Sequence, residues 1–296
     1  MKVYQNYPVA QLTTFGLGGN AEKVVFPESP EELAACVEKL SRSGENYFLL
    51  GNGSNLIFQD CRIEGTLVVN RSPGLISEED DCIRADSSVS LSNLLEFCLG
   101  NGIGGYEFLS GIPGTVGGAV SGNAGAYGDS IGNFVRTAEL YSPEKGIFQA
   151  GQGDFNFDYR ESEVKRKKLV ITRVALSKPS RSSSWCIKSR TGEILAQRDS
   201  KLPPRGTPCA GSFFKNVLLP GADRRTAAAW FIDQAGCKGL RVGGIEVSPY
   251  HANFIVNKGN SSFSELQELV QIVKERVRDK FRIELQEEVI YYPQLR

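Results

Sequence analysis

The first 50 residues contain two short apolar runs and, between them, one segment with helical spacing of apolar side chains. Residues 24–26 and 47–50 are runs of apolar side chains typical of short buried strands. Between them, apolar side chains recur every three or four positions over residues 33–40, which is the spacing of an amphipathic helix. Residues 29–32 (Ser-Pro-Glu-Glu) predict the start of this helix with a capping box, and Gly44 predicts its end. The pattern therefore predicts a βαβ unit.

The same two patterns recur through the rest of the chain. They predict strands at 68–70, 82–85, 135–141, 169–176 and 289–292, and helices at 91–99, 224–235 and 263–281. The last helix also carries a capping box, formed by Ser262 and Glu265, ahead of its apolar stripe. No internal repeat is visible.

A change of composition divides the chain. Residues 179–205 are polar and rich in Ser, Pro and Arg, which is typical of a linker region. We expect one subdomain at 1–70, a second at 71–178, and a C-terminal domain at 206–296.

Composition excludes several classes of protein. Lys plus Arg and Asp plus Glu balance at 34 each, so bulk charge predicts neither a nucleic-acid nor a membrane partner. No apolar run is long enough to span a bilayer, and the first residues lack the apolar core of a signal peptide. Seven cysteines without a C-x-x-C pair indicate a reducing cytoplasm. With His251 as the sole histidine, no metal site is expected.

Residues 110–128 form the densest glycine stretch, with seven glycines and almost no charge. Such a stretch is either a flexible linker or backbone that must pass close to something. Ile112, Val116, Val120 and Tyr127 favour the second interpretation, because a linker would carry polar residues instead. We expect a rigid loop whose N–H groups line a bound phosphate or flat ring.

A second glycine loop, at 51–55 (GNGSN), directly follows a predicted strand. Leu56 stands where a Rossmann fingerprint needs its third glycine, and no helical pattern follows at once, which disfavours a nicotinamide-type Rossmann site. The two loops together suggest a cofactor with a pyrophosphate, held by backbone N–H groups of two small subdomains.

Some candidate residues have plain structural alternatives. Ser212 and Lys215 form an S-x-x-K pair, as in penicillin-recognising enzymes, but Pro220-Gly221 and the lack of a Lys-Thr-Gly segment disfavour acyl-enzyme chemistry. Residues 212–214 also fit an ordinary strand. Taken alone, Arg160 fits a surface arginine, Glu288 fits a solvated carboxylate, and His251 fits a structural histidine.

Taken together, short segments along the whole chain resemble the bacterial UDP-N-acetylenolpyruvoylglucosamine reductase family. The segments that carry this resemblance, in order and with correct spacing, are 13–19 (TTFGLGG), 51–56 (GNGSNL), 110–118 (SGIPGTVGG), 123–128 (NAGAYG), 159–162 (YRES), 210–216 (AGSFFKN), 232–239 (IDQAGCKG), 251–257 (HANFIVN) and 287–289 (EEV). The chain is similar to the compact type of this family, which lacks an extra tyrosine-bearing loop.

The resemblance implies an α+β fold. Two subdomains would form an FAD-binding fold of the vanillyl-alcohol-oxidase (PCMH) type, followed by a C-terminal α+β domain for substrate. It implies an oxidoreductase, a UDP-N-acetylmuramate dehydrogenase of peptidoglycan synthesis. FAD would be bound non-covalently, NADPH would be the co-substrate, and the protein would be cytoplasmic, as a monomer or weak homodimer.

The resemblance also implies roles for particular residues. Arg160 would bind the substrate carboxylate, Ser212 would be the general acid, and Glu288 would stabilise the enol. Residues implied to contact the cofactor are Gly51, Asn52, Gly53, Ser54, Asn55, Leu56, Gly111, Ile112, Pro113, Gly114, Thr115, Gly117, Gly118, Asn123, Ala124, Gly125, Ala126 and Tyr127. Residues implied to contact substrate are Tyr159, Lys215, Asn216 and Asn257.

Four residues, at three places in the chain, depart from the family pattern. Ile290 stands where a basic residue is common, and Val217 replaces a common proline. Ile245-Glu246 stands where a small residue and Gln are usual. None of these changes removes one of the implied catalytic residues, but together they indicate a divergent member.

Overall fold

The computed structural model describes residues 1–294, over which the chain divides into two compact units, each built from separate stretches of sequence. The first unit comprises Met1–Tyr7, Ala21–Asn52 and Glu64–Gln197. The second comprises Pro8–Asn20, Gly53–Ile63 and the chain from Arg198 onward. This division differs from the expected boundaries, because two short N-terminal segments belong with the C-terminal part.

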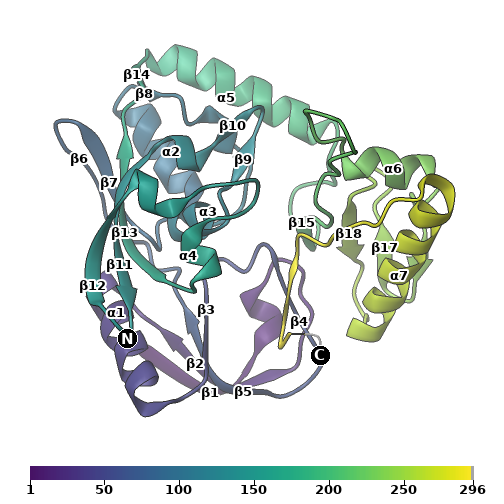
Figure 1. Cartoon of the computed structure of the whole chain (residues 1–296), viewed down its shortest axis with the longest axis horizontal. Coiled ribbons are helices and arrows are strands. Elements are labelled where there is room, and N and C mark those ends of the chain that lie inside the picture. Colours follow the sequence, from purple (N-terminus) through teal and green to yellow (C-terminus); the bar gives the residue numbers. More distant parts are fainter. Residues whose placement is uncertain (295–296) are drawn as a thin grey trace. The chain divides into compact units, whose positions relative to one another are not determined.

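One sheet of the first unit contains the predicted βαβ unit (Figure 1). Its strand order is β1 (Lys2–Pro8), β2 (Asn20–Phe26), β5 (Ile63–Val69) and β3 (Tyr47–Leu50). Strand β3 runs parallel to β5, and helix α1 (Pro30–Ser43) connects β2 to β3. The predicted strands and helix of this unit are therefore confirmed.

Helix α1 begins and ends at the predicted caps. The Ser29 hydroxyl accepts the Glu32 backbone N–H at 3.2 Å, and Gly44 closes the helix at φ 68°. The Glu32 carboxylate accepts the backbone N–H of Glu28 at 2.9 Å instead of returning to Ser29, so the predicted reciprocal box does not form.

The buried face of α1 packs against two sheets. Leu33, Val37 and Leu40 share a core cluster with Val25 and Val68 of the first sheet, and that cluster continues to Tyr141 and Val170 of the second.

The second sheet of this unit is antiparallel, with strand order β12-β11-β13-β7-β6. These strands are β12 (Gly146–Gly151), β11 (Val135–Ser142), β13 (Val170–Ser177), β7 (Cys82–Asp86) and β6 (Ile76–Glu78). The first unit also contains the helices α2 (Leu91–Gly100), α3 (Val116–Ser121) and α4 (Glu163–Arg166). Two short strand pairs complete it: β8 (Ile103–Gly104) with β14 (Ser180–Arg181), and β9 (Gly125–Ala126) with β10 (Asp129–Ser130).

The expected linker contains a helix. Helix α5 (Ser184–Asp199) occupies most of residues 179–205, which corrects the prediction of a turn-rich segment. Ile187 and Ile194 are its buried residues and lie seven positions apart, so they share one face of the helix. The remaining polar residues of α5 are typical of a helix with a narrow apolar face, which composition alone does not distinguish from a linker.

The second unit has a sheet covered by two helices (Figure 1). The strand order is β15 (Cys209–Ser212), β18 (Phe254–Asn257), β17 (Ile245–Val247) and β16 (Arg241–Val242). Helices α6 (Ala228–Gln234) and α7 (Phe263–Phe281) complete its core. Helix α7 has the predicted bounds and capping box, whereas α6 begins four residues later than predicted.

Backbone pairing joins the two N-terminal segments, Pro8–Asn20 and Gly53–Ile63, to the rest of the second unit. Strand β4 (Leu56–Phe58) pairs in parallel with β19 (Ile290–Tyr292). The Cys209 backbone N–H donates to the Thr14 carbonyl at 3.1 Å, and the Thr14 hydroxyl donates to the Cys209 carbonyl at 2.6 Å. These partners lie about 200 residues apart in sequence, so local patterns do not reveal them.

Some features are absent from the described part of the chain. None of its helices is long and apolar enough to cross a membrane. Residues 1–294 hold no cluster of three His, Cys, Asp or Glu side chains arranged for a metal ion. All seven cysteines lie within those residues and are free thiols.

Candidate active site

The glycine-rich residues 110–118, here called the glycine wall, contribute residues 111–115 to the lining of a cavity in the first unit. Its volume is about 610 Å³, within the usual range for small-molecule sites. The residues predicted to bind a cofactor that line it are Asn52, Gly111, Ile112, Pro113, Gly114 and Thr115. The stretch continues directly into helix α3, and its Val116 and Val120 are buried, which favours the predicted packed loop over a flexible linker.

The other side of the cavity was missed in the sequence. It includes Ser88, Ser90, Ser92 and Asn93. They belong to the segment 86–93, here called the serine wall, which runs from the end of β7 into α2. The lining residues that were not predicted are Arg71, Ser72, Pro73, Ser88, Ser90, Ser92, Asn93, Leu95 and Leu109. A signal existed, since four serines occur within residues 87–92, between a predicted strand and a predicted helix.

Backbone hydrogen bonds hold the two walls together. The Val116 N–H donates to the Val89 carbonyl at 2.8 Å, and the Gly117 N–H donates to the Ser87 carbonyl at 2.9 Å. This approach needs glycine at 117, because a Cβ there would lie 2.8 Å from Ser87 Cβ. Gly117 therefore serves the contact between the walls.

The predicted glycine at 51 has a similar role. A Cβ on Gly51 would lie 2.6 Å from the hydroxyl oxygen of Thr115, closer than real Cβ contacts come. Thr115 is buried, and its hydroxyl caps α3 by accepting the Gly118 N–H at 3.2 Å. The start of the 51–55 loop therefore packs against Thr115 of the glycine wall in the first unit.

Arg160 lies in a tight turn of the first unit. Asp158 and Glu161 exchange backbone hydrogen bonds of 3.0 and 3.1 Å, which leaves Tyr159 and Arg160 at the tip. The Arg160 guanidinium lies 5.4 Å from the centre of the Tyr159 ring and donates to the Gly125 carbonyl at 3.1 Å. The backbone of Arg160 is left-handed at φ 59°, a conformation that a non-glycine residue adopts only at some cost.

Residues 123–127 support this turn. The Asn123 side chain donates to the Asp158 carbonyl at 2.9 Å and accepts the Gly132 N–H at 3.1 Å. Asn123 is buried, whereas Tyr127 is exposed. The predicted cofactor stretch 123–127 is thus joined to the Arg160 turn through the Asn123 side chain and the Gly125 carbonyl.

In the second unit, Ser212 and Glu288 are brought together at Phe213. Ser212 ends β15, and the Glu288 N–H donates to the carbonyl of the next residue, Phe213, at 2.8 Å. Phe214 pairs with Glu287 in an isolated β-bridge, and the Lys215 N–H donates to the Gln286 carbonyl at 2.8 Å. We call this pairing of residues 212–215 with 286–288 the strand junction.

Asn253 fastens the strand junction to the loop that follows β17. Its side chain accepts the Phe214 N–H and donates to the Phe214 carbonyl, both at 2.9 Å. Its carbonyl accepts the Phe213 N–H at 2.8 Å. Asn253, Phe213 and Phe214 are all buried, so water cannot reach these backbone groups. The bonds from Asn253 satisfy them instead. Sequence reasoning gave Asn253 no role.

His251 in turn supports Asn253. Its Nδ1 accepts the Asn253 backbone N–H at 3.2 Å, which requires a ring without a proton on that atom. Burial lowers the pKa of His251 below its ordinary value, with a smaller effect from Lys238. The structural interpretation of the sole histidine is thereby favoured.

The remainder of the 51–56 loop lies in the second unit. The Asn55 side chain donates to the Glu288 carbonyl at 3.0 Å, and the Ile290 N–H donates to the Asn55 carbonyl at 3.0 Å. Gly53 passes so close to the backbone that a Cβ there would lie 2.1 Å from the Leu12 carbonyl oxygen. Asn55, predicted to contact cofactor, is therefore also a direct support of Glu288.

The residues predicted to contact substrate have varied surroundings. Tyr159 lies beside Arg160 in the first unit. In the second unit, the Asn216 side-chain oxygen accepts the Ala228 N–H at 3.2 Å and so caps α6, and Lys215 belongs to the strand junction. Asn257 is buried, and its side chain bonds to Phe15, Gly259 and Ser261. The described partners of Asn257 thus give it a structural role within the second unit.

The structure does not support acyl-enzyme chemistry at Ser212. An S-x-x-K enzyme needs a helix that begins at the serine, so that the lysine lies one turn further on. Here Ser212 is the last residue of a strand, and Phe213 and Phe214 behind it are buried.

Comparison with known proteins gives two family matches. An FAD binding domain matches residues 21–148, and the C-terminal domain of UDP-N-acetylenolpyruvoylglucosamine reductase matches residues 203–292. A UDP-N-acetylenolpyruvoylglucosamine reductase of Solibacter usitatus is 38% identical over 98% of this chain and 97% of its own length. One of Caldanaerobacter subterraneus is 35% identical over 97% and 93%.

A solved structure is similar over the whole chain. The crystal structure of UDP-N-acetylenolpyruvylglucosamine reductase from Thermus caldophilus covers 99% of this chain with 98% of its own, at 29% identity and a TM-score of 0.79. The similarity in structure and the similarity in sequence therefore point to the same family.

Proposed function

The chain belongs to the UDP-N-acetylenolpyruvoylglucosamine reductase family, and we propose that it uses NADPH to reduce the enolpyruvyl ether of UDP-N-acetylglucosamine to UDP-N-acetylmuramate. It is a flavoprotein oxidoreductase of peptidoglycan synthesis with FAD as its cofactor. The observation that carries the proposal is the strand junction, where Ser212 and Glu288 flank the same residue, Phe213.

The residues of the cavity fit FAD. A flavin dinucleotide presents phosphates, ribose hydroxyls and flat rings. The cavity offers Arg71 and hydroxyl groups of the serine wall for the polar parts, and Leu95, Leu109 and Ile112 for a ring. We propose that the glycine and serine walls hold the cofactor, without a covalent bond.

When bound, FAD supplies the redox chemistry, which carries electrons from NADPH to the enolpyruvyl group. Negative charge then develops on the substrate carboxylate and the carbon beside it. Arg160 would bind that carboxylate through two parallel hydrogen bonds, since a fixed guanidinium needs no reorganisation when the charge appears. The contacts of the guanidinium with the Gly125 carbonyl and the Tyr159 ring restrict its position before substrate binds.

Ser212 would donate the proton that completes the product. Serine is a weak acid, so it must be held at the reacting carbon, and the junction supplies this by fixing both neighbouring strands. Glu288 would stabilise the enol or orient the proton, and the Asn55 side chain holds its backbone. Lys215, at the end of the junction, would help through its charge.

Three further side chains are proposed to contact the UDP-sugar. Tyr159, Lys215 and Asn216 would contact the UDP-sugar, whereas Asn257 would act through the segment that it holds near Phe15. We propose no nucleic-acid or membrane partner, a cytoplasmic location and a monomer or weak homodimer.

NADPH oxidation, measured with and without the enolpyruvyl substrate under anaerobic conditions, tests the proposal. We expect substrate to convert a single bleaching of the flavin into continuous turnover, with UDP-N-acetylmuramate as the product. Acid precipitation should release the yellow colour from the protein. A protein that binds FAD but oxidises NADPH no further when substrate is added would be a non-catalytic module of this fold.

A further inference from the structure

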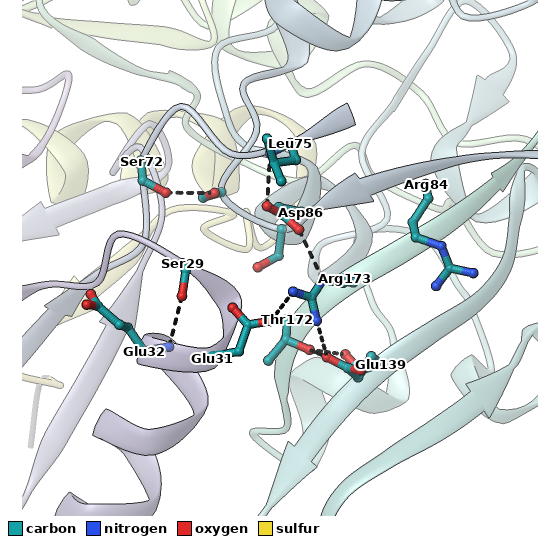
Figure 2. Close-up of polar contacts among 12 residues, drawn as sticks. Ser29, Glu31, Glu32, Ser72, Leu75, Arg84, Asp86, Glu139, Thr172 and Arg173 are labelled. Atoms are coloured by element: carbon teal, nitrogen blue, oxygen red, sulfur yellow. Dashed lines mark hydrogen bonds and ion pairs between the residues drawn. The ribbon is translucent and has the colours of Figure 1, made fainter. Parts of the chain in front are cut away.

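Arg173 lies at the centre of a cluster of carboxylates that includes Asp86, the first residue of the serine wall (Figure 2). It lies in β13, directly opposite Asp86 of β7. Its guanidinium is bonded to Asp86 Oδ1 at 3.3 Å and to Glu139 Oε1 at 3.2 Å, and it also pairs closely with Glu31. One guanidinium thus serves three carboxylates from three different elements.

Asp86 uses its second oxygen to hold the next segment. Asp86 Oδ2 accepts the Leu75 N–H at 2.9 Å, and the backbone N–H of Asp86 donates to the Leu75 carbonyl at 2.9 Å (Figure 2). Its own carbonyl accepts the Val89 N–H at 3.1 Å. Only 8% of the Asp86 side chain is exposed, so these partners, rather than water, satisfy its oxygens.

The segments that Asp86 joins both line the cavity. Ser72 and Pro73 precede Leu75, and Ser88 and Ser90 follow Asp86. The Ser72 hydroxyl donates to the Ser88 hydroxyl at 3.0 Å, which fastens the two segments to one another. The position of both lining segments is therefore set through Asp86, and Asp86 is set by Arg173.

Glu31 extends the same cluster to α1. It lies in the first turn of that helix, where a carboxylate is favourable, and the Arg173 guanidinium holds the pKa of Glu31 at about 2. Since α1 packs against both sheets of the first unit, the cluster ties the cavity lining to the helix between them.

We propose that Arg173 is a positioning residue for FAD: through Asp86 it fixes the two segments, 72–75 and 86–90, that line the cavity. The inference rests on the proposed function in one respect, namely that this cavity holds the cofactor. Removal of the guanidinium leaves three neighbouring carboxylates without the cation that they share. The segments then lose their fixed position, and FAD must supply the ordering when it binds.

The test compares Arg173→Gln with two matched variants. Arg173→Lys keeps the charge but cannot serve several carboxylates with a planar fork. Arg84→Gln is the control, because Arg84 lies on β7 near the cluster but pairs with Glu79, at 2.7 Å, outside the cavity. Figure 2 shows Arg84 apart from the dashed contacts around Arg173. Each apo-protein is titrated with FAD by flavin fluorescence, and turnover is measured at saturating FAD.

We expect Arg173→Gln to raise the dissociation constant for FAD about tenfold, which corresponds to ~1.4 kcal/mol. Arg173→Lys should raise it about threefold and Arg84→Gln less than twofold, with turnover at saturating FAD unchanged in all three. A merely structural role would lower the melting temperature of the apo-protein but leave the dissociation constants of the folded variants equal.

Two outcomes overturn the inference. If wild-type protein binds FAD and both Arg173 variants bind it as tightly as Arg84→Gln does, the positioning role is wrong while the proposed function stands. If wild-type protein binds no FAD, the proposed function fails as well. Should Arg173→Gln not fold, Arg173→Lys alone decides between these results, because it keeps the cationic charge.

Discussion

The cavity walls of the first unit and the strand junction of the second are built in opposite ways. The walls are made of glycine backbone and small hydroxyl side chains that lie against each other, as at Gly117 and Ser87. The junction is a pairing of two backbone segments that places Ser212 and Glu288, the two proposed catalytic side chains, next to one buried phenylalanine. One region works through its shape and the other through particular functional groups.

This difference predicts opposite sensitivities to mutation. Adding a carbon atom at Gly117, where the walls meet, should disturb packing and cofactor binding, because Ser87 already occupies the space that it needs. Removing an atom from the junction should disturb chemistry while the fold survives. Substitutions in the two regions can therefore be compared directly.

Ser212→Ala should have the largest effect. The variant keeps the backbone of β15 but loses the proposed proton donor, so we expect substrate-dependent oxidation of the reduced flavin to slow by about 10²–10⁴-fold. Reduction of the flavin by NADPH and the affinity for FAD should stay near wild type. Stopped-flow absorbance separates the two half-reactions. Ser264→Ala, at an exposed position of α7, is the control.

Fast oxidation by substrate in Ser212→Ala would contradict the role of Ser212 as general acid. Equal slowing of both half-reactions would instead indicate damage to the cofactor site. Either result would remove the distinction between walls and junction.

Asn253→Ala should have the next largest effect, this time on stability. The change leaves the Phe214 N–H and carbonyl buried without their partners, which we expect to lower the free energy of unfolding by about 2–3 kcal/mol. Urea denaturation measures this change. Gln267→Ala, on the exposed face of α7, should change the same quantity by less than about 0.5 kcal/mol.

An Asn253→Ala protein as stable as the Gln267→Ala control would show that Asn253 does not fasten the junction. The proposed positioning of Ser212 would then need another support.

Local patterns in the sequence predicted much of the fold. Helix α7 has its predicted bounds because Ser262 and Glu265 satisfy backbone groups that any helix start exposes. The glycine wall was also predictable, since dense glycine among apolar residues indicates close backbone approach. These features depend on neighbours in sequence.

The features that the sequence did not predict depend on hydrogen bonds between residues far apart in the chain. Residues 53–63 belong with the C-terminal part because Asn55 and β4 pair with residues near 290, and no local pattern records that pairing. The serine wall and Arg173 were missed for the same reason, since a hydroxyl or a guanidinium acquires its role only from the segments around it. The roles of Asn253 and Asn55 likewise depend on partners far along the chain.

Gly117→Ala tests whether the cavity walls tolerate an added methyl group. A methyl group there would collide with Ser87, whereas at Gly118 the nearest atom lies at 3.4 Å. We expect Gly117→Ala to lower the free energy of unfolding by about 1–2 kcal/mol and to weaken FAD binding. Gly118→Ala should be neutral or gain up to about 1 kcal/mol, because alanine favours helix. Urea denaturation and FAD titration of both variants measure the difference. Equal effects at the two positions would mean that the contact with Ser87 is not what requires glycine.

The smallest expected effect concerns pH at the junction. Burial lowers the pKa of His251 below its ordinary value of 6.5, so the unfolded chain takes up a proton at a higher pH than the folded chain does. The stability that comes from neutral His251 is complete above about pH 7 and is lost as pH falls through 6.5 toward the lower, folded pKa. A protonated Nδ1 can no longer accept the Asn253 N–H. Because His251 is the sole histidine of the chain, no other histidine contributes in this range.

His251→Gln should remove this pH dependence, since the variant has no titrating group at that position. We expect the free-energy advantage of wild type over His251→Gln to shrink measurably, by up to about 1 kcal/mol, between pH 7.5 and 5.5 in urea denaturation at each pH. A constant advantage over that range would show that the folded and unfolded states protonate His251 alike. The Nδ1 contact to Asn253 would then contribute nothing to the junction, and its support would come from the Asn253 side chain alone.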